Sequence, residues 1–157
     1  MNAPTFLAAR TPLRTGNAAA AILILDDGRY ILQLRDDAPH IWYPGHWGLF
    51  GGAVDPGEDA LSALRRELLE ELELQIGEAR LFASFGFDLQ PIGLNDCYRN
   101  YYEIPVALDA WERAVLHEGA EVQALPGDAA LALPRLSPYD AFALFLHHHR
   151  GRLGASP

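Results

Sequence analysis

Residues 52–74 read GAVDPGEDALSALRRELLEELEL, and this stretch decides the fold. Its first part holds Pro56 and Gly57, a pair typical of a turn. Acidic residues follow where the positive end of a helix dipole favours anions. Its second part carries a leucine at every third or fourth position, which is the spacing of one helix face. The pattern predicts a turn and then a helix over about residues 58–74 that packs on a core. The packing residues would be Leu61, Leu64, Leu68 and Leu72.

Three glutamates gather on another side of this expected helix, namely Glu67, Glu70 and Glu71. Residues three and four apart are neighbours on a helix, and like charges at that spacing repel one another. A helix shaped only for stability would avoid this arrangement, whereas hard cations such as Mg²⁺ or Mn²⁺ prefer carboxylate oxygens. Arg66 could tether one of these carboxylates by a bidentate contact. The alternative is a charged, solvated helix face, which composition alone favours.

The residues in front of the helix, WGLFGGAVDPGE at 47–58, place a glycine pair between two short apolar runs. Glycine adopts positive φ readily and lets a ligand approach the backbone closely. An outward-facing carbonyl at this pair could therefore join the carboxylates around a metal ion. The turn thus favours a metal site over a solvated helix face.

Turn and helix together resemble the signature of the Nudix hydrolase family. That signature is Gly, five residues, Glu, seven residues, and then Arg-Glu-apolar-any-Glu-Glu-any-Gly-apolar. Gly52, Glu58 and Arg66 stand at this spacing, and the glutamates after Arg66 match every charged position. The one departure is Glu73, where the family usually has a glycine that lets the helix end in the left-handed conformation. We therefore expect the helix to continue to about Gly77.

The resemblance implies an α/β fold, the Nudix-type α/β/α sandwich with a mixed β-sheet between helices. It also implies Mg²⁺ or Mn²⁺ as the cofactor. Glu67 and Glu71 would be the principal metal ligands and Glu70 a third. The carbonyl of Gly51 would complete the inner sphere. Arg66 would hold the carboxylates in place, paired with the first glutamate of the signature.

The general base is less defined, because the resemblance assigns it either to a signature glutamate or to an acid on a later loop. For that loop we expect Glu118 first and Glu121 second, since both follow a predicted strand and flank Gly119, a natural turn residue. Both could equally be ordinary surface acids.

Substrate contacts are expected from four residues outside the signature. Arg35, at the end of a predicted strand, and His46, in the following loop, could contact phosphate. An ion pair of Arg35 with a neighbouring aspartate and a solvated His46 are the plainer alternatives. Arg99 and Tyr101 share one face of a long predicted strand with Glu103 and could line the substrate cleft.

His147, His148 and His149 resemble a metal site at first sight. Consecutive residues on a helix point in different directions, so the three cannot chelate together. We interpret them as cations favoured by the dipole at a helix C-terminus. The single cysteine, Cys97, excludes an intramolecular disulfide and a cysteine-based zinc site, suits a reducing cytoplasm, and is expected to be inert.

Length and composition indicate a single globular domain over residues 1–157, with an irregular segment at 1–16. The formal charge of −9 argues against a nucleic-acid polymer as partner. No apolar run reaches the ~18 residues of a membrane span, and the N-terminus does not read as a signal peptide. A cytoplasmic location is expected.

Strands are predicted at 18–25, 30–35, 47–49, 53–54, 79–89 and 97–108, with one more before 125, and further helices at 128–133 and 139–149.

The leading functional hypothesis is a metal-dependent hydrolase that cleaves a pyrophosphate linkage in a nucleoside diphosphate joined to another moiety. Its products would be a nucleoside monophosphate and a phosphorylated remainder. One alternative is an isoprenoid diphosphate isomerase-like enzyme, for which Cys97 is the sole candidate cysteine. The other is a module that senses nucleotides without cleaving them. The expected partner is a small nucleotide-type diphosphate, and a homodimer is compatible with the fold.

Overall fold

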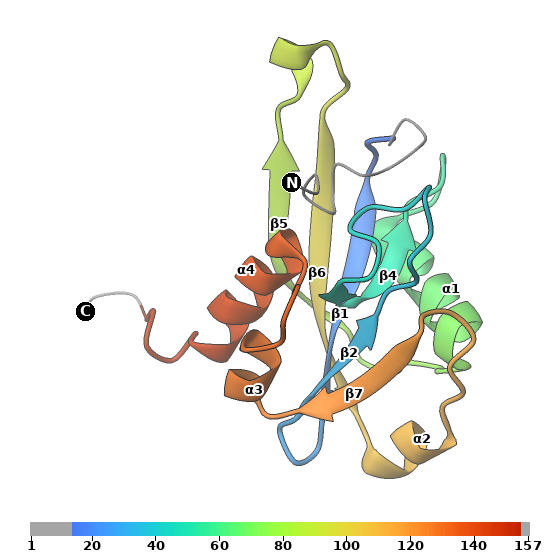
Figure 1. Ribbon diagram of the computed structural model, residues 1–157, viewed down its shortest axis with the longest axis vertical. Helices are drawn as coiled ribbons and strands as arrows, with labels where there is room; N and C mark the ends of the chain where they lie inside the picture. The colour runs from blue at the N-terminus through green and yellow to red at the C-terminus, as the bar shows by residue number, and fades with distance from the viewer. Residues whose placement is uncertain (1–13, 155–157) are drawn as a thin grey trace, which may run out of the picture.

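The computed structural model describes residues 14–154, which form a seven-stranded mixed sheet between helices (Figure 1). The strand order is β3-β2-β1-β6-β5, with β4 also paired to β1 and β7 to β2. β1 runs parallel to β6, and the other pairs are antiparallel. The strands are β1 (Ala18–Leu25), β2 (Tyr30–Leu34), β3 (Trp47–Gly48), β4 (Phe50–Ala53), β5 (Arg80–Phe87), β6 (Cys97–Val106) and β7 (Glu121–Leu125). The helices are α1 (Ala60–Leu72), α2 (Leu108–Arg113), α3 (Gly127–Leu131) and α4 (Pro138–His148), with a short 3₁₀ turn η2 (Gln90–Ile92).

β1 lies at the centre of the sheet because its eight residues are all apolar and can be covered on both faces. It leads into β2 through Asp27-Gly28, and Gly28 has φ 85°, a value that glycine adopts without a steric penalty. The predicted strand at 18–25 is confirmed at both ends.

The two faces of the sheet carry separate hydrophobic clusters, since side chains alternate along a strand. Ala19, Ala21 and Leu23 of β1 pack with α1 on one face. Ala20 and Ile22 face the other way, where α3 and α4 cover the sheet. Figure 1 shows α1 on one side of β1 and α3 and α4 on the other. This is the expected α/β/α sandwich.

Helix α1 is shorter than the sequence predicts at both ends. It begins after Asp59, whose side chain accepts hydrogen bonds from the backbone N–H groups of Leu61 and Ser62. It ends at Leu72, because Glu73 itself adopts the left-handed conformation with φ 53°. The Glu73 N–H then donates to the carbonyl of Leu69 at 3.0 Å. The expected continuation to Gly77 is wrong: glycine is preferred at this cap but is not required.

Other departures are local. The second glycine-flanking strand lies at 50–53 rather than 53–54, and the sequence reading did not include α2. The expected irregular segment 1–16 lies mostly outside the described residues, and 14–16 carry no helix or strand. No helix within residues 14–154 combines the length and apolar character needed to cross a membrane.

Candidate functional site

An acidic cluster, formed by Glu58, Glu67, Glu70 and Glu71, lies at the junction of β4 and α1, and Arg66 contacts the first three of these residues. Its guanidinium donates to both carboxylate oxygens of Glu58, with Nη2 to Oε2 at 3.0 Å, and through Nη1 to Oε1 of Glu67 at 2.7 Å. Nη2 also lies 3.3 Å from the carbonyl oxygen of Ala53 on β4. The planar fork of donors thus joins the turn, the strand and the helix, which a lysine could not do.

Glu71 is the buried member of the cluster, with 5% of its surface exposed. Its Oε2 accepts a hydrogen bond from the N–H of Gly51 at 3.3 Å. Burial, together with the neighbouring carboxylates of Glu67 and Glu118, raises the pKa of Glu71 to about 8. Burial also raises the pKa of Glu67, opposed by the contact with Arg66. Mutually repelling, desolvated carboxylates are a donor set that a divalent cation would stabilise.

The two expected loop acids lie in different surroundings. Glu118 is close enough to Glu67 and Glu71 for its charge to act on both. The N–H of the preceding His117 donates to the carbonyl oxygen of Glu71 at 2.8 Å, which fixes the loop against α1. Glu121 is already within β7, opposite Leu34 of β2.

The glycine pair is constrained on both sides. Gly51 has φ 131°, and a Cβ there would lie 2.2 Å from the carbonyl oxygen of Ala19. A Cβ on Gly52 would lie 2.5 Å from the carboxyl carbon of Glu67. The strand therefore passes directly under the acids because it lacks side chains there.

The carboxylates are not drawn together into a closed ligand set. Within residues 14–154, no three of the cluster's acids bring ligand atoms within 4.8 Å of one another. Arg66 holds Glu67 on one side, and the side chain of Glu70 is 62% exposed with Oε2 3.6 Å from Arg66 Nη1. Glu70 would have to turn toward Glu67 and Glu71 to share an ion with them.

A cavity of about 550 Å³ adjoins the cluster at β4. Gly51, Gly52 and Ala53 line it, and the same three residues lie against Glu71, Glu67 and Arg66. A pocket of this size with a mainly apolar lining and a few cationic side chains is typical of a small-molecule site. Its other walls include Trp42, Phe87, Leu89, Ile92, Leu94, Tyr98 and Tyr139.

Arg99 lies in the wall of this cavity, and its guanidinium is fixed by contacts with three neighbouring side chains. Its Nη2 pairs with Oδ1 of Asp140 at 3.0 Å, and its guanidinium stacks over the ring of Tyr139 at 4.4 Å. Its Nε donates to the hydroxyl of Tyr101 at 3.0 Å. Tyr101 itself is fully buried and is not part of the cavity lining, contrary to the expectation that it lines a cleft. Glu103 instead contacts His147 at the far end of β6.

The remaining expected contacts separate into two cases. Arg35 lines the cavity, and its Nε donates to the carbonyl of Trp42 at 3.1 Å, so it orders the loop after β2. Its charge also acts on Glu71, where it opposes the rise in pKa. His46 lies outside the lining, with Nδ1 2.9 Å from the carbonyl oxygen of Pro44.

Sequence reasoning missed Asp140, which is 1% exposed. Besides Arg99 it accepts hydrogen bonds from the N–H of Leu49 at 3.0 Å and the hydroxyl of Ser137 at 2.9 Å. An acid in the first turn of a helix reads as a partner of the helix dipole, so nothing in the local pattern distinguishes it.

Comparison with known proteins assigns the family. The model of the NUDIX domain matches residues 14–138. The chain belongs to the Nudix family. Among curated proteins it is similar to the nucleoside triphosphatase NudI of Escherichia coli O1:K1, with 48% identity over 54 residues, which is 34% of this chain. That match spans only 38% of the relative's own length.

Solved Nudix structures share the fold over most of the chain. The MutT protein from Methanosarcina mazei aligns with a TM-score of 0.69 at 20% identity, covering 91% of this chain and all of that one. The MutT NUDIX hydrolase from Burkholderia pseudomallei aligns with a TM-score of 0.64 at 25% identity, covering 84% of this chain and 97% of that one.

Proposed function

We propose that this Nudix protein is a single-domain, metal-dependent pyrophosphohydrolase that acts on a small nucleotide. Glu67 and Glu71 are its principal ligands for Mg²⁺ or Mn²⁺, with Glu70 and the Gly51 carbonyl completing the set. The observation that carries the proposal is the position of Glu71, which is buried beside Glu67 with a raised pKa, at the strand that also lines the cavity. When bound, the cation would neutralise diphosphate oxygens and acidify a water molecule.

The protein's own groups divide the remaining work. Arg66 orients Glu67 and Glu58, and so fixes the direction of the carboxylates. Glu118 is the first candidate for the base, because it is the loop acid whose charge reaches both Glu67 and Glu71. A carboxylate this close to the expected metal ligands can accept a proton from a water molecule held there. Glu121, held in β7, is the second candidate.

Two substrate classes fit the cavity. The first is a nucleoside diphosphate joined to another group, whose base would stack on the aromatic walls at Trp42 and Tyr139. The second is a nucleoside triphosphate, which the similarity to the nucleoside triphosphatase NudI favours. In both, Arg35 and Arg99 would face the anionic or carbonyl groups of the ligand. The chain would act in the reducing, cytoplasmic compartment that its single cysteine favours.

The test is a panel of both substrate classes with Mg²⁺ or Mn²⁺, assayed by chromatography of the products. Cleavage of a linked diphosphate yields two monoesters, so phosphate appears only after phosphatase is added. Cleavage of a triphosphate to a monophosphate releases pyrophosphate, so phosphate appears after pyrophosphatase alone. The two enzymes thereby distinguish the two substrate classes.

Glu71→Gln is the decisive variant, because it preserves the shape and removes the charge. We expect turnover to fall by at least about 100-fold while the circular dichroism spectrum is unchanged. Wild-type turnover in Glu71→Gln would refute the assignment. Nucleotide binding without any turnover by the wild type would instead identify a sensing module. Glu118→Gln and Glu121→Gln, assayed across pH, identify the base.

A further inference from the structure

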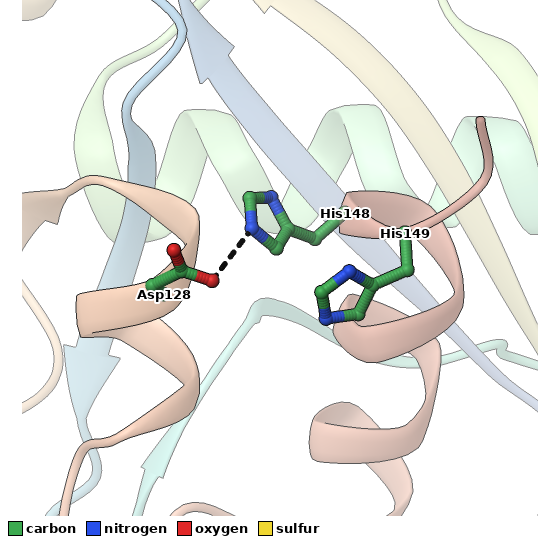
Figure 2. Close-up of side chains that lie close together, drawn as sticks. All are labelled: Asp128, His148 and His149. Atoms are coloured by element: carbon green, nitrogen blue, oxygen red, sulfur yellow. Dashed lines mark hydrogen bonds and ion pairs between the residues drawn. The ribbon is translucent and has the colours of Figure 1, made fainter. Parts of the chain in front are cut away.

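Two helices on the face of the sheet opposite α1 bring an aspartate and two histidines together (Figure 2). Asp128 lies in the first turn of α3, and His148 and His149 lie at the end of α4. One ligand atom from each residue can be chosen so that all three lie within 4.8 Å of one another. None of the three residues belongs to the acidic cluster or to the cavity.

The end of α4 explains how neighbouring histidines converge. His147 turns into the core, where its Nδ1 lies 2.9 Å from the hydroxyl of Tyr30. His148 is the last helical residue, and His149 is the cap, with φ −96° and ψ 9°. The sequence argument that consecutive histidines diverge therefore holds for His147 and fails for the other two, whose ring centroids are 4.8 Å apart.

The position of His148 is set by its packing on α3. A Cβ on Gly127 would lie 2.1 Å from its Nδ1, so the ring rests against the Gly127 backbone and can do so only because that residue is glycine. The opposite ring nitrogen, Nε2, is thereby directed at Oδ1 of Asp128, 3.0 Å away. Figure 2 shows the imidazole between the two helices, with this contact drawn as a dashed line.

The spacing fits a tetrahedral metal ion. Two ligand atoms about 2.0–2.1 Å from one tetrahedral Zn²⁺ lie about 3.3 Å apart, close to the separation of His148 Nε2 and Asp128 Oδ1. The ring of His149 packs at its edge on Phe145, with centroids 4.7 Å apart, and one of its nitrogens lies within 4.8 Å of a ligand atom of each of the other two residues. Two imidazoles and one carboxylate suit borderline transition metals rather than Mg²⁺.

We propose that Asp128, His148 and His149 form a Zn²⁺-type transition-metal site, separate from the acidic cluster. The ion joins the start of α3 to the end of α4, with water in its open coordination position. Because α4 also carries Asp140, which holds Arg99 in the cavity wall, the ion stabilises the helical layer behind that wall. The site is independent of any hydrolytic activity of the chain.

Zn²⁺ titration of tag-free protein, followed by calorimetry in excess Mg²⁺, tests the site. Mg²⁺ competes for carboxylates and poorly for imidazole, so histidine-dependent binding remains visible. We expect Asp128→Asn, His148→Gln and His149→Gln each to weaken Zn²⁺ binding by at least about tenfold. His40→Gln, which removes an exposed loop histidine, should leave binding unchanged.

Two further measurements make the test specific to these ligands. Co²⁺ bound to the wild type should show visible d–d absorption of a tetrahedral site, lost in His149→Gln. Zn²⁺ at about 100 times the wild-type Kd should raise the Tm of the wild type by about 5–10 °C and that of His149→Gln by at most about half as much. Equal Zn²⁺ affinity in the wild type and all three ligand variants would overturn the proposal. So would an unchanged Tm in the wild type.

Discussion

Asp140 on α4 lies 3.0 Å from the guanidinium of Arg99 on β6, so the last helix fixes a cation in the wall of the cavity. The same carboxylate accepts from the N–H of Leu49, two residues before Gly51. One buried side chain therefore links the cavity wall to the strand that passes under Glu67 and Glu71. The acidic cluster and the cavity share this support because both adjoin β4.

Replacing Asp140 by asparagine should destabilise the fold strongly. Arg99 would remain largely buried without a counter-charge, which typically costs about 3–5 kcal/mol in the free energy of unfolding. Urea denaturation measures this directly. The matched control is Asp109→Asn, which breaks an exposed pair with Arg113 and should leave the urea midpoint nearly unchanged. Equal losses of unfolding free energy in the two variants would show that Asp140 does not stabilise the fold by pairing with Arg99.

Gly52→Ala should separate function from stability. Its Cβ would meet the carboxylate of Glu67, which can swing away at little cost to the fold but then leaves its place in the cluster. We expect Mn²⁺ affinity and turnover to fall by about 10- to 100-fold, with the free energy of unfolding changed by less than about 1 kcal/mol. The control is Gly86→Ala in β5, whose added Cβ would have nothing within 4 Å. It should retain the Mn²⁺ affinity and the turnover of the wild type.

Glu73 offers a test of helix termination. Glu73→Gly relieves a left-handed conformation that costs about 1 kcal/mol in a residue with a Cβ, but it removes the contact with His117. Glu73→Ala removes the same contact and keeps the strain. Thermal and urea denaturation should therefore find Glu73→Gly more stable than Glu73→Ala by about 1 kcal/mol. A result in the other direction would mean that the cap is not strained.

The protein should lose stability in alkali. Burial raises the pKa of the hydroxyls of Tyr30, Tyr101 and Tyr139 above the usual value near 10. Above that pH the unfolded chain releases these protons and the folded chain keeps them, so the free energy of unfolding falls as pH rises. Tyrosinate absorbance and urea midpoints at about pH 9 and about pH 11 measure both effects. Full native ionisation near pH 10, as in urea, would contradict this.

Features fixed by local pattern were predictable from the sequence. The apolar run of β1 and the Asp27-Gly28 turn define a hairpin without reference to the rest of the chain. The spacing of the leucines and glutamates determines which side of α1 packs on the sheet and which side carries the acids. Arg66 and Glu67 follow from the same helix, because their contact is between neighbours in sequence.

Features that depend on distant packing were not predictable. Asp140 becomes important only because β6 brings Arg99 beneath it, 41 positions away in the sequence. His148 can approach Asp128 only because residue 127 is a glycine, and the contact between Gly127 and His148 joins two different helices. Tyr101 faces inward because α4 covers that side of the sheet, which the alternation along one strand does not specify.

The arrangement around β4 has a consequence for how such proteins diverge. Helix α1, which carries the acids, packs on the alanines of β1 on one face of the sheet. The outer rim of the cavity is formed instead by the hairpin around η2 and the loop after β2. Substitutions on that rim can alter which compound fits without displacing a single carboxylate. Ligand preference can thus drift between related chains while the reactive centre stays unchanged.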